Sequence, residues 1–545
     1  MRPEEKMGSP FTPRFNTNYV PSDEEIERIR ADLVSHSQEL ARIDERICEL
    51  SAARDRIKDY INSHRALISH PRRLPTDVVR EIFVACLPTT TNAVMSVWEA
   101  PLVLCRICSA WRSIALSTPR LWASLHLPVD FVLNKKEQRM SAMARWLQLS
   151  GACPVSFSVM EDRPAWGMQW DYADPDVIVF IKLLAEFSDR WCSVEFSHVS
   201  RAAMLGLAGI HTPMMNSLKI TAEVSVLCQL DVFRAPSLHA LALHAQGPEQ
   251  LDEFVLDLPL FWDRLTHLHL DSSGPQSPSQ GLSLYSVFVL LGRCPQLASF
   301  AFRANAALYR ADSISRVISL PFLTSFILFE PGILEPSSVG HLMEHLSMPE
   351  LRHLHVPIVL RRVVPTANFL VVIGTRSPLI ETLVMNLRPF NKRSLLEGLR
   401  CFPSLTKLTA WGSPPVRQLE EEIFVHPEDL LTLLTPEGTT VTTVCPQLRD
   451  LRILESQKIS KDVLVTFVQR RMGSAAAPHS LEVVFNESRN RLSLLEDEVQ
   501  YFASRGFNLS LLANVSPWDT VDRWGEHIAT TASTGLPTMN WTETF

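Results

Sequence analysis

Glycine is scarce in this sequence. The 545 residues include only 19 glycines, about half of the usual share of roughly 7%. The chain contains no Walker-type phosphate-binding loop, no G-x-G-x-x-G fingerprint and no G-x-S-x-G nucleophile elbow. The sequence therefore gives no support for a nucleotide-binding protein, or for a hydrolase built on that elbow.

Long apolar runs and an excess of basic residues are also lacking. The longest apolar runs, residues 287–292 and 369–374, are far shorter than the roughly 20 residues of a membrane span. There are 52 Lys and Arg against 59 Asp and Glu, a formal charge of −7, whereas proteins that bind phosphate backbones normally carry a basic excess. We expect no membrane segment and no nucleic-acid partner. Residues 1–21 are polar and do not resemble a secretory signal, so a cytoplasmic or nuclear protein is expected.

The ten cysteines are scattered along the chain, with no disulfide-dense segment. This distribution is typical of reduced thiols inside the cell. Cys105 and Cys108 form a C-x-x-C pair, but no second pair of cysteines or histidines lies at the spacing that four-coordinate zinc requires. We expect both sulfurs to pack in a helical core without a metal.

A long helix is predicted near the N-terminus. Residues 22–64 contain neither proline nor glycine, and apolar residues recur at seven-residue steps in two series. Offsets of three and four residues place both series on one stripe, as in a coiled-coil seam. Two interpretations are open: the stripe pairs with a second copy to form a homodimer, or the helix folds back on its own chain. The series are Ile26, Leu33, Leu40, Ile47, Arg54 and Ile61, and Ile29, His36, Ile43, Leu50, Ile57 and His64.

Two apolar helices are predicted within residues 72–122. Pro75 and Asp77 suit a first helical turn, where a missing N–H costs little and a negative charge meets the helix dipole. A second helix is expected from about residue 101 to residue 115. Two such helices carry more apolar surface than so small a unit can hide, which indicates a partner groove. The first helix has two apolar rows, Val78, Ile82 and Cys86 in one and Val79, Phe83 and Leu87 in the other.

Several short motifs follow one another in this segment. They are Leu74-Pro75, Asp77, Ile82-Phe83, Ile107-Cys108, Trp111-Arg112 and Pro119-x-Leu121-Trp122.

This ordered set resembles an F-box, the helical module by which substrate receptors dock on the Skp-type linker subunit of cullin–RING ubiquitin ligases. An upstream coil followed by such a segment is similar to the arrangement in many fungal F-box-like proteins. The sequence departs from the family at residues 88–100, a long, threonine-rich connection where the family usually has a short, leucine-bearing one. The resemblance implies a small all-α domain whose linker-binding residues are Leu74, Pro75, Val78, Ile82, Phe83, Leu102, Ile107, Cys108, Trp111 and Trp122.

A phrase recurs through the rest of the chain: proline, any residue, then three apolar residues spaced three and two apart, as in Pro236-x-Leu238-x-x-Leu241-x-Leu243. Two apolar residues at period two give a short strand with one buried face, and the third fills the turn that enters it. Proline fixes the chain before the ladder begins. Further copies start at Pro295, Pro321, Pro349, Pro378, Pro403 and Pro446, one without proline has its triplet at Leu265, Leu268 and Leu270, and weaker copies start at Pro213 and Pro478.

Helical patterns lie between the copies, at residues 282–291, 339–346, 394–399 and 430–434. One strand and one helix cannot bury each other's faces alone, so neighbours must stack into an α/β solenoid with parallel strands and outer helices. The array resembles leucine-rich repeats, although the asparagine that this family carries after the last strand leucine is mostly missing.

Outward-facing strand positions are expected to line the concave surface of the solenoid, which usually binds a partner. Ile327, Phe329 and Trp411 are candidate anchors, since aromatic residues dominate binding hot spots. The alternative is that loops or the C-terminal tail cover them. The candidate target-binding residues are Ile327, Phe329, His353, His355, Lys407 and Trp411.

Metal and catalytic motifs are few. His244, His267 and His269 lie on neighbouring predicted strands, but they lack an obvious carboxylate or thiol set to complete a metal site. His341-Leu-Met-Glu-His345 matches the H-x-x-E-H string of zinc proteases, yet it falls in a predicted repeat helix. We therefore expect no catalytic residue, metal or cofactor, and an adaptor rather than an enzyme.

These expectations divide the chain into a disordered tail (1–21), a coiled-coil-like helix (22–69), an F-box-like domain (70–124), a leucine-rich-repeat-like solenoid (125–512) and a C-terminal tail (513–545). The expected function is that of the substrate-receptor subunit of an SCF-type ubiquitin ligase. The Skp-type linker would join it to the cullin scaffold, and the solenoid would hold an unidentified target protein. The alternative is a ligase-independent scaffold that uses the coil and the solenoid to bind proteins.

Overall fold

The structure is a computed structural model that describes residues 9–68, 70–128, 136–160, 175–197, 199–246, 251–273, 281–305, 316–329, 336–357, 369–412, 425–436, 444–456, 459–472, 480–485, 496–504 and 508–513. The chain divides into two compact units, Met1–Val79 and Arg80–Phe545. The predicted C-terminal tail 513–545 lies outside the described residues except for Ala513, which ends the last described strand.

The first unit contains the predicted long helix, α1 (Asp23–Leu67), which is 45 residues long. Ser22 and Glu25 form a capping box at its start: Ser22 N donates to the Glu25 carboxylate at 2.9 Å, and Glu25 N donates to Ser22 Oγ at 3.4 Å. None of the described side chains of α1 is buried. Two short 3-10 helices flank it, η1 (Thr12–Arg14) and η2 (His70–Arg73).

The predicted pair of short helices is present, but the second is broken. α2 (Thr76–Ala85) begins after Pro75 and runs across the boundary between the units. In place of one helix over 101–115 there are α3 (Leu104–Ile107) and α4 (Ser109–Leu116), followed by η3 (Pro119–Trp122). The break falls at Cys108, whose extended backbone ends α3 and whose Sγ accepts the N–H of Trp111 at 3.4 Å. Helical spacing alone does not reveal such a cap.

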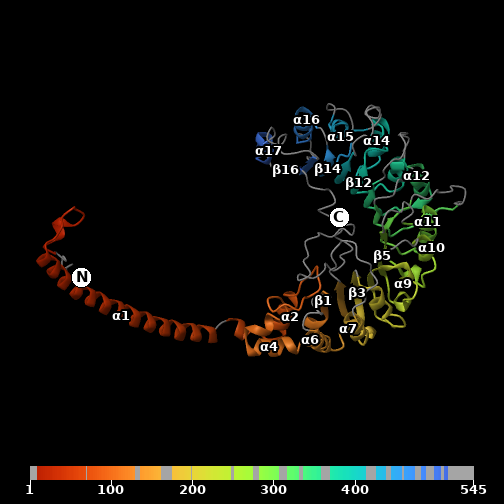
Figure 1. Ribbon diagram of the computed structural model, residues 1–545. Helices are drawn as coiled ribbons and strands as arrows, with labels where there is room; N and C mark the ends of the chain where they lie inside the picture. Colours follow the sequence, from red (N-terminus) through yellow and green to blue (C-terminus); the bar gives the residue numbers. More distant parts are fainter. Residues whose placement is uncertain are drawn as a thin grey trace. The chain divides into compact units, whose positions relative to one another are not determined.

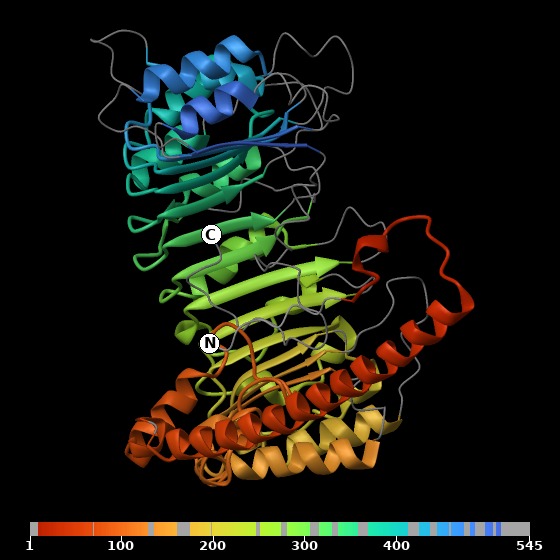
Figure 2. The ribbon, with the colours of Figure 1, turned by 90° about the vertical axis from the view of Figure 1, so that its left-hand side faces the viewer.

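The second unit is a mixed α/β array whose described strands form one 14-stranded parallel sheet, arranged in chain order except that β8 and β10 pair separately. Figure 2 shows these strands stacked as successive rungs. The strands are β1 (Ser124–Pro128), β2 (Val155–Met160), β3 (Trp191–Ser197), β4 (Ser217–Glu223), β5 (Ala240–Gln246), β6 (His267–Ser273), β7 (Ser299–Arg303), β8 (Ile318–Ser319), β9 (Ser325–Phe329), β10 (Leu346–Ser347), β11 (His353–Val356), β12 (Thr382–Asn386), β13 (Lys407–Trp411), β14 (Asp450–Ser456), β15 (Ser480–Phe485) and β16 (Asn508–Ala513).

Helices connect the strands and lie on the outer side of the arc that the strands line (Figure 1). The second unit is therefore solenoid-like. Its remaining helices are α6 (Lys136–Leu149), α7 (Pro175–Ala185), α8 (Arg201–Leu205), α9 (Val224–Leu227), α10 (Leu251–Val255), α11 (Leu284–Arg293), α12 (Pro336–Glu344), α13 (Phe369–Arg376), α14 (Lys392–Leu399), α15 (Pro427–Leu434), α16 (Lys461–Met472) and α17 (Glu496–Ala503), with 3-10 turns η4 (Ser188–Arg190), η5 (Asp231–Arg234) and η6 (Trp262–Arg264).

The recurring phrase forms the strand and the turn before it. In the copy at Pro236, the turn residue Leu238 and the strand residues Leu241 and Leu243 are all buried, as are their equivalents in the other clear copies. One carbonyl between turn and strand accepts two consecutive N–H groups of the next repeat: His239 O accepts from Thr266 N at 2.8 Å and from His267 N at 3.1 Å. The same double contact recurs at the carbonyls of Asn216, Thr266, Ala298, Thr324, Arg352, Glu381 and Thr406.

Two parts of the array differ from the predicted phrase. The strands β1 to β3 precede the first copy identified in the sequence, because no proline stands two residues before the turn residue of their repeats. A buried tryptophan takes the place of the smaller apolar turn residue: Trp122 before β1, and Trp191 as the first residue of β3. In the weak copy at Pro478, the buried strand residues lie two positions earlier in the chain than the phrase predicted. β15 buries Leu481 and Val483, which pair with Leu451 and Ile453 of β14.

The connection at residues 88–100 covers the free edge of β1. Asn92 Nδ2 donates to Ser158 Oγ of β2 and Asn92 Oδ1 accepts from Ser124 Oγ of β1, both at 3.0 Å. His126 N donates to the Ala93 carbonyl at 2.7 Å, and Val94 makes a parallel bridge to His126. The connection therefore protects an edge strand, which would otherwise offer unpaired backbone groups to other chains.

Candidate partner-binding surfaces

One row of apolar side chains along α2 is exposed. In α2, Ile82 is 42% exposed, and Cys86, directly after the end of the helix, is also exposed. Val78, one turn before Ile82 in the same helix, is 45% exposed, and Leu74 and Pro75 ahead of the helix are exposed as well. Val78 and Ile82, two of the predicted docking residues, are thus accessible to solvent.

The adjacent row of α2 is buried. Val79 and Phe83 are 3% and 0% exposed. The Phe83 ring meets the ring of Trp111 from α4 edge to face, with the centroids 4.9 Å apart. Phe83 was predicted to bind the linker, and this assignment needs correction: its side chain is fully inside its own unit, where it fixes α2 against α4.

Trp122 also lies in the interior and not on the docking surface. Its indole Nε1 donates to the Ala115 carbonyl at 2.9 Å, and its ring meets that of Trp146 in α6 edge to face at 4.8 Å. Only 2% of Trp122 is exposed. It therefore joins the end of α4 to the first helix of the array, and its predicted role as a linker contact is wrong.

The remaining predicted docking residues stay at or near the surface. Ile107 is 55% exposed, Leu102 and Trp111 are half-buried, and Cys108 is exposed. The expectation that the Cys105 and Cys108 sulfurs both pack in a core is wrong for Cys108, which caps α4. Burial does raise the pKa of the Cys105 thiol.

An exposed tryptophan that sequence reasoning missed lies beside α3. Trp98 is 78% exposed, and the Arg106 guanidinium carbon lies 5.1 Å from the centroid of its ring. Arg106 Nη1 also donates to the Val97 carbonyl at 3.2 Å, and Val97 is itself 47% exposed. The signal available in the sequence was a tryptophan within an otherwise threonine-rich connection. Val97 and Trp98 therefore add exposed apolar surface next to α3.

The concave face of the sheet is closed in one part and open in another. One lateral row of side chains can be followed through the register from β1 to β15. Its members from β1 to β7 are all buried: His126, Ser158, Glu195, Lys219, Ala242, His269 and Ala301. Those from β9 to β15 are all half-buried and remain partly accessible to solvent: Ile327, His355, Val384, Thr409, Arg452 and Glu482.

The closed part contains paired charges. Lys219 Nζ lies 3.0 Å from Glu195 Oε1. Asp271 lies between His244 Nδ1 at 3.2 Å and Arg303 Nε at 2.5 Å. Burial by itself raises the pKa of the Asp271 carboxyl, but the contact with His244 and the charge of Arg303 outweigh it and hold that pKa below its usual value. Buried charges need such pairing, so this region is a structural network.

The predicted target-binding residues fall mostly in the open part. Lys407 is exposed, and His353 and His355 are half-buried. The Phe329 ring, also half-buried, stacks on His269 with the centroids 4.7 Å apart. Trp411 was expected to be an exposed anchor, but only 6% of it is exposed and its ring lies 6.4 Å from that of His355, so that expectation is wrong. Ile327 is half-buried.

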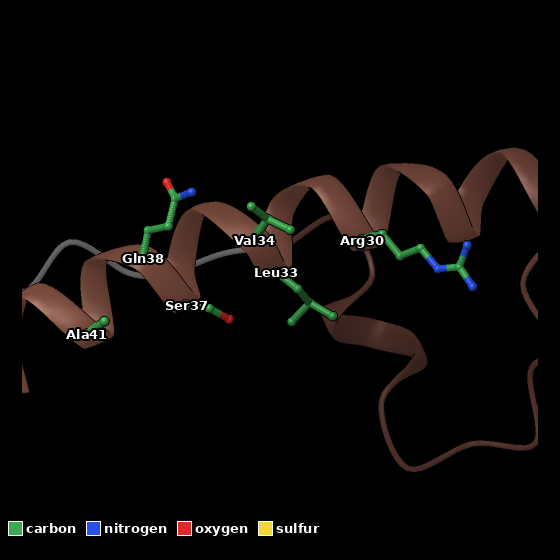
Figure 3. A pocket seen from close by; sticks show the side chains of 6 residues that line it. All are labelled: Arg30, Leu33, Val34, Ser37, Gln38 and Ala41. Atoms are coloured by element: carbon green, nitrogen blue, oxygen red, sulfur yellow. The ribbon is translucent and has the colours of Figure 1, made fainter.

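No group of three or more metal-ligating side chains is present among the described residues. In the H-x-x-E-H string, His345 Nδ1 contacts the His341 carbonyl at 2.9 Å and Leu342 is buried, as a repeat helix requires. A hollow along α1 is lined by residues of that helix alone (Figure 3), so it has no opposing wall to enclose a small molecule.

Within the described parts of the chain, no helix has both the length and the apolar character needed to cross a bilayer. No family model matches the chain, and no curated protein matches it either.

Proposed function

We propose that this chain is the substrate-receptor subunit of a cullin–RING ubiquitin ligase, working in the cytoplasm or nucleus. In this proposal residues 70–124 are an F-box that docks on the Skp-type linker, which joins the receptor to the cullin scaffold. The array holds a target protein near the conjugating enzyme. The receptor supplies no catalytic group; it acts by raising the effective concentration of the target at the enzyme.

The observation that carries the proposal is the division of α2 into a buried row and an exposed row. Phe83 holds the helix in place, whereas Ile82 and Cys86 face solvent. Apolar side chains aligned at helical spacing are the usual anchors of a helix in a partner's groove. Ile107 and Trp98 add exposed apolar surface from the same unit.

We also propose that the array belongs to the leucine-rich-repeat type. Each repeat supplies one short strand with two buried apolar residues, and helices cover the outer side. Apart from a step of 43 residues between Leu405 and Leu448, the repeat steps of about 23–32 residues favour this type. The target then binds on the open part of the concave face, around Ile327, His355 and Lys407, because the part from β1 to β7 has few accessible side chains.

The direct test is affinity capture of the full chain with a recombinant Skp-type linker. The unmodified chain should retain the linker, and Val78→Asp combined with Ile82→Asp should abolish retention, because two charges would have to be buried at the interface. Val179→Asp is the matched control, since Val179 is an aliphatic residue of α7 with 49% exposure.

The outcomes separate the receptor from the ligase-independent scaffold. Retention by the chain and by the Val179→Asp control, but not by the double variant, supports the receptor. A folded chain that retains no linker leaves only the scaffold.

A further inference from the structure

α1 presents a largely apolar seam to solvent. The helix is roughly 67 Å long at 1.5 Å per residue, and none of its described side chains is buried. Helices in proteins owe most of their stability to packing of an apolar face, so this seam needs a cover. Seven of its aliphatic residues are between 43% and 61% exposed: Leu33, Leu40, Ile43, Ile47, Leu50, Ile57 and Ile61.

The polar residues of the seam are already partnered on their own helix. His36 Nδ1 lies 3.2 Å from Asp32 Oδ1, and Arg54 Nη2 lies 3.0 Å from Asp55 Oδ1. His64 Nδ1 contacts the Tyr60 carbonyl at 2.9 Å. Because each of these three side chains has a partner on its own helix, covering the seam with another helix would leave none of them without a polar contact.

We propose that α1 pairs with α1 of a second copy of this chain in a parallel, in-register, two-stranded coiled coil. A second copy supplies a seam of the same length and the same seven-residue step. Each exposed side chain leaves on the order of 80–100 Å² open, so two seams would cover roughly 1,100–1,400 Å², at the lower end of the roughly 1,200–2,000 Å² that stable interfaces bury. This inference does not depend on the proposed ligase function.

The charges beside the seam select the parallel orientation. In a parallel pair, Glu25 faces Arg30 of the second copy, and one like-charge contact arises, between Glu39 and Asp44. An antiparallel pair of full overlap would place Arg30 against Lys58, Arg46 against its own copy and Asp44 against its own copy. Asp23 with Arg65 is the one opposite-charge contact in that arrangement. Like charges at these flanking positions oppose pairing, so the parallel arrangement is favoured.

The first test measures the mass of the full chain in solution by sedimentation or light scattering. We expect about twice the chain mass of 61.5 kDa. Leu33→Arg with Leu40→Arg should give the monomer. The control, Val34→Arg with Ala41→Arg, makes the same two changes one residue further along the chain. Because Leu33 and Val34 point to different sides of the helix (Figure 3), the control should stay dimeric. A monomeric unmodified chain, or a seam variant that remains dimeric, overturns the proposal.

The second test reads the orientation. In a Cys48→Ser background, Leu33→Cys should give a disulfide-linked dimer on mild oxidation, whereas Val34→Cys should not. An antiparallel pair would hold the two copies of residue 33 about 36 Å apart, too far for a disulfide. A dimer that fails to cross-link through residue 33 therefore overturns the parallel arrangement.

Discussion

Ile82 and Phe83 are neighbours in α2, yet Ile82 is 42% exposed and Phe83 is 0% exposed. The sequence motif that contains both residues therefore combines two different functions. Phe83 holds the helix against Trp111, and Ile82 is available to a partner.

Phe83→Ala should lower the free energy of unfolding of the second unit by about 3–5 kcal/mol, because it removes a fully buried ring and leaves a cavity. Ile82→Ala should change it by no more than about 0.5 kcal/mol, as is usual for exposed positions. Urea unfolding followed by circular dichroism measures both. Equal losses for the two variants would contradict the assignment of buried and exposed rows.

Trp98→Ala should weaken binding of the Skp-type linker about tenfold or more without lowering the melting temperature. The expectation follows from the 78% exposure of this tryptophan beside α3 and from the weight of tryptophan in binding hot spots. Isothermal titration calorimetry measures the affinity. Tyr285→Ala, at a 50% exposed aromatic residue of α11, is the control and should bind as the unmodified chain does. Unchanged affinity in Trp98→Ala would exclude the connection at 88–100 from the docking surface.

Arg471→Met should destabilise the array by about 2–4 kcal/mol, since it leaves buried carbonyls without donors. Arg471 is fully buried and donates to the carbonyls of Leu434, Val444 and Cys445 at 2.9, 2.6 and 3.1 Å. The adjacent Arg470 is exposed, so Arg470→Met is a matched control with an expected change below about 0.5 kcal/mol. Thermal unfolding of both variants shows whether the buried arginine stabilises the array more than the exposed one does.

The repeat phrase predicted the buried triplets of the array because strand period and burial are local properties of the sequence. It did not predict the arginines that tie one repeat to the one before it. Arg190, Arg293 and Arg471 donate to main-chain carbonyls at or just after the C-terminal ends of α6, α10 and α15. These contacts join residues about 37–43 positions apart, and nothing in the local pattern marks such an arginine.

The candidate surfaces were predicted only in part, for a similar reason. Helical spacing identified the two rows of α2 but not which of them faces α4. Strand alternation placed Trp411 on the concave face, but burial there depends on neighbouring strands and not on alternation. The break at Cys108 depends on a thiol that caps α4, a contact without a distinctive sequence signature.

Stability of the second unit should fall as the pH drops below about 6.5. Burial lowers the pKa of His269 to about 3 and the pKa values of His267 and His355 to about 4. Between these values and about 6.5 the unfolded chain binds protons that the folded chain does not, so stability rises with pH across this window. The slope is at most about 1.4 kcal/mol per pH unit for each histidine.

Melting temperatures between pH 5 and pH 8 measure this dependence. His269→Gln removes one of the titrating groups and should flatten the curve. A melting temperature that is independent of pH in the unmodified chain would contradict the lowered pKa values of these histidines.

The central claim is that the exposed face of α2 and α3 is covered by a linker subunit. Hydrogen–deuterium exchange of the full chain, with and without a saturating Skp-type linker, tests it most directly. We predict slower exchange in peptides covering residues 74–87 and 97–111, with the strands β9 to β15 unchanged. Unaltered exchange in both helical peptides at saturating linker would contradict the claim.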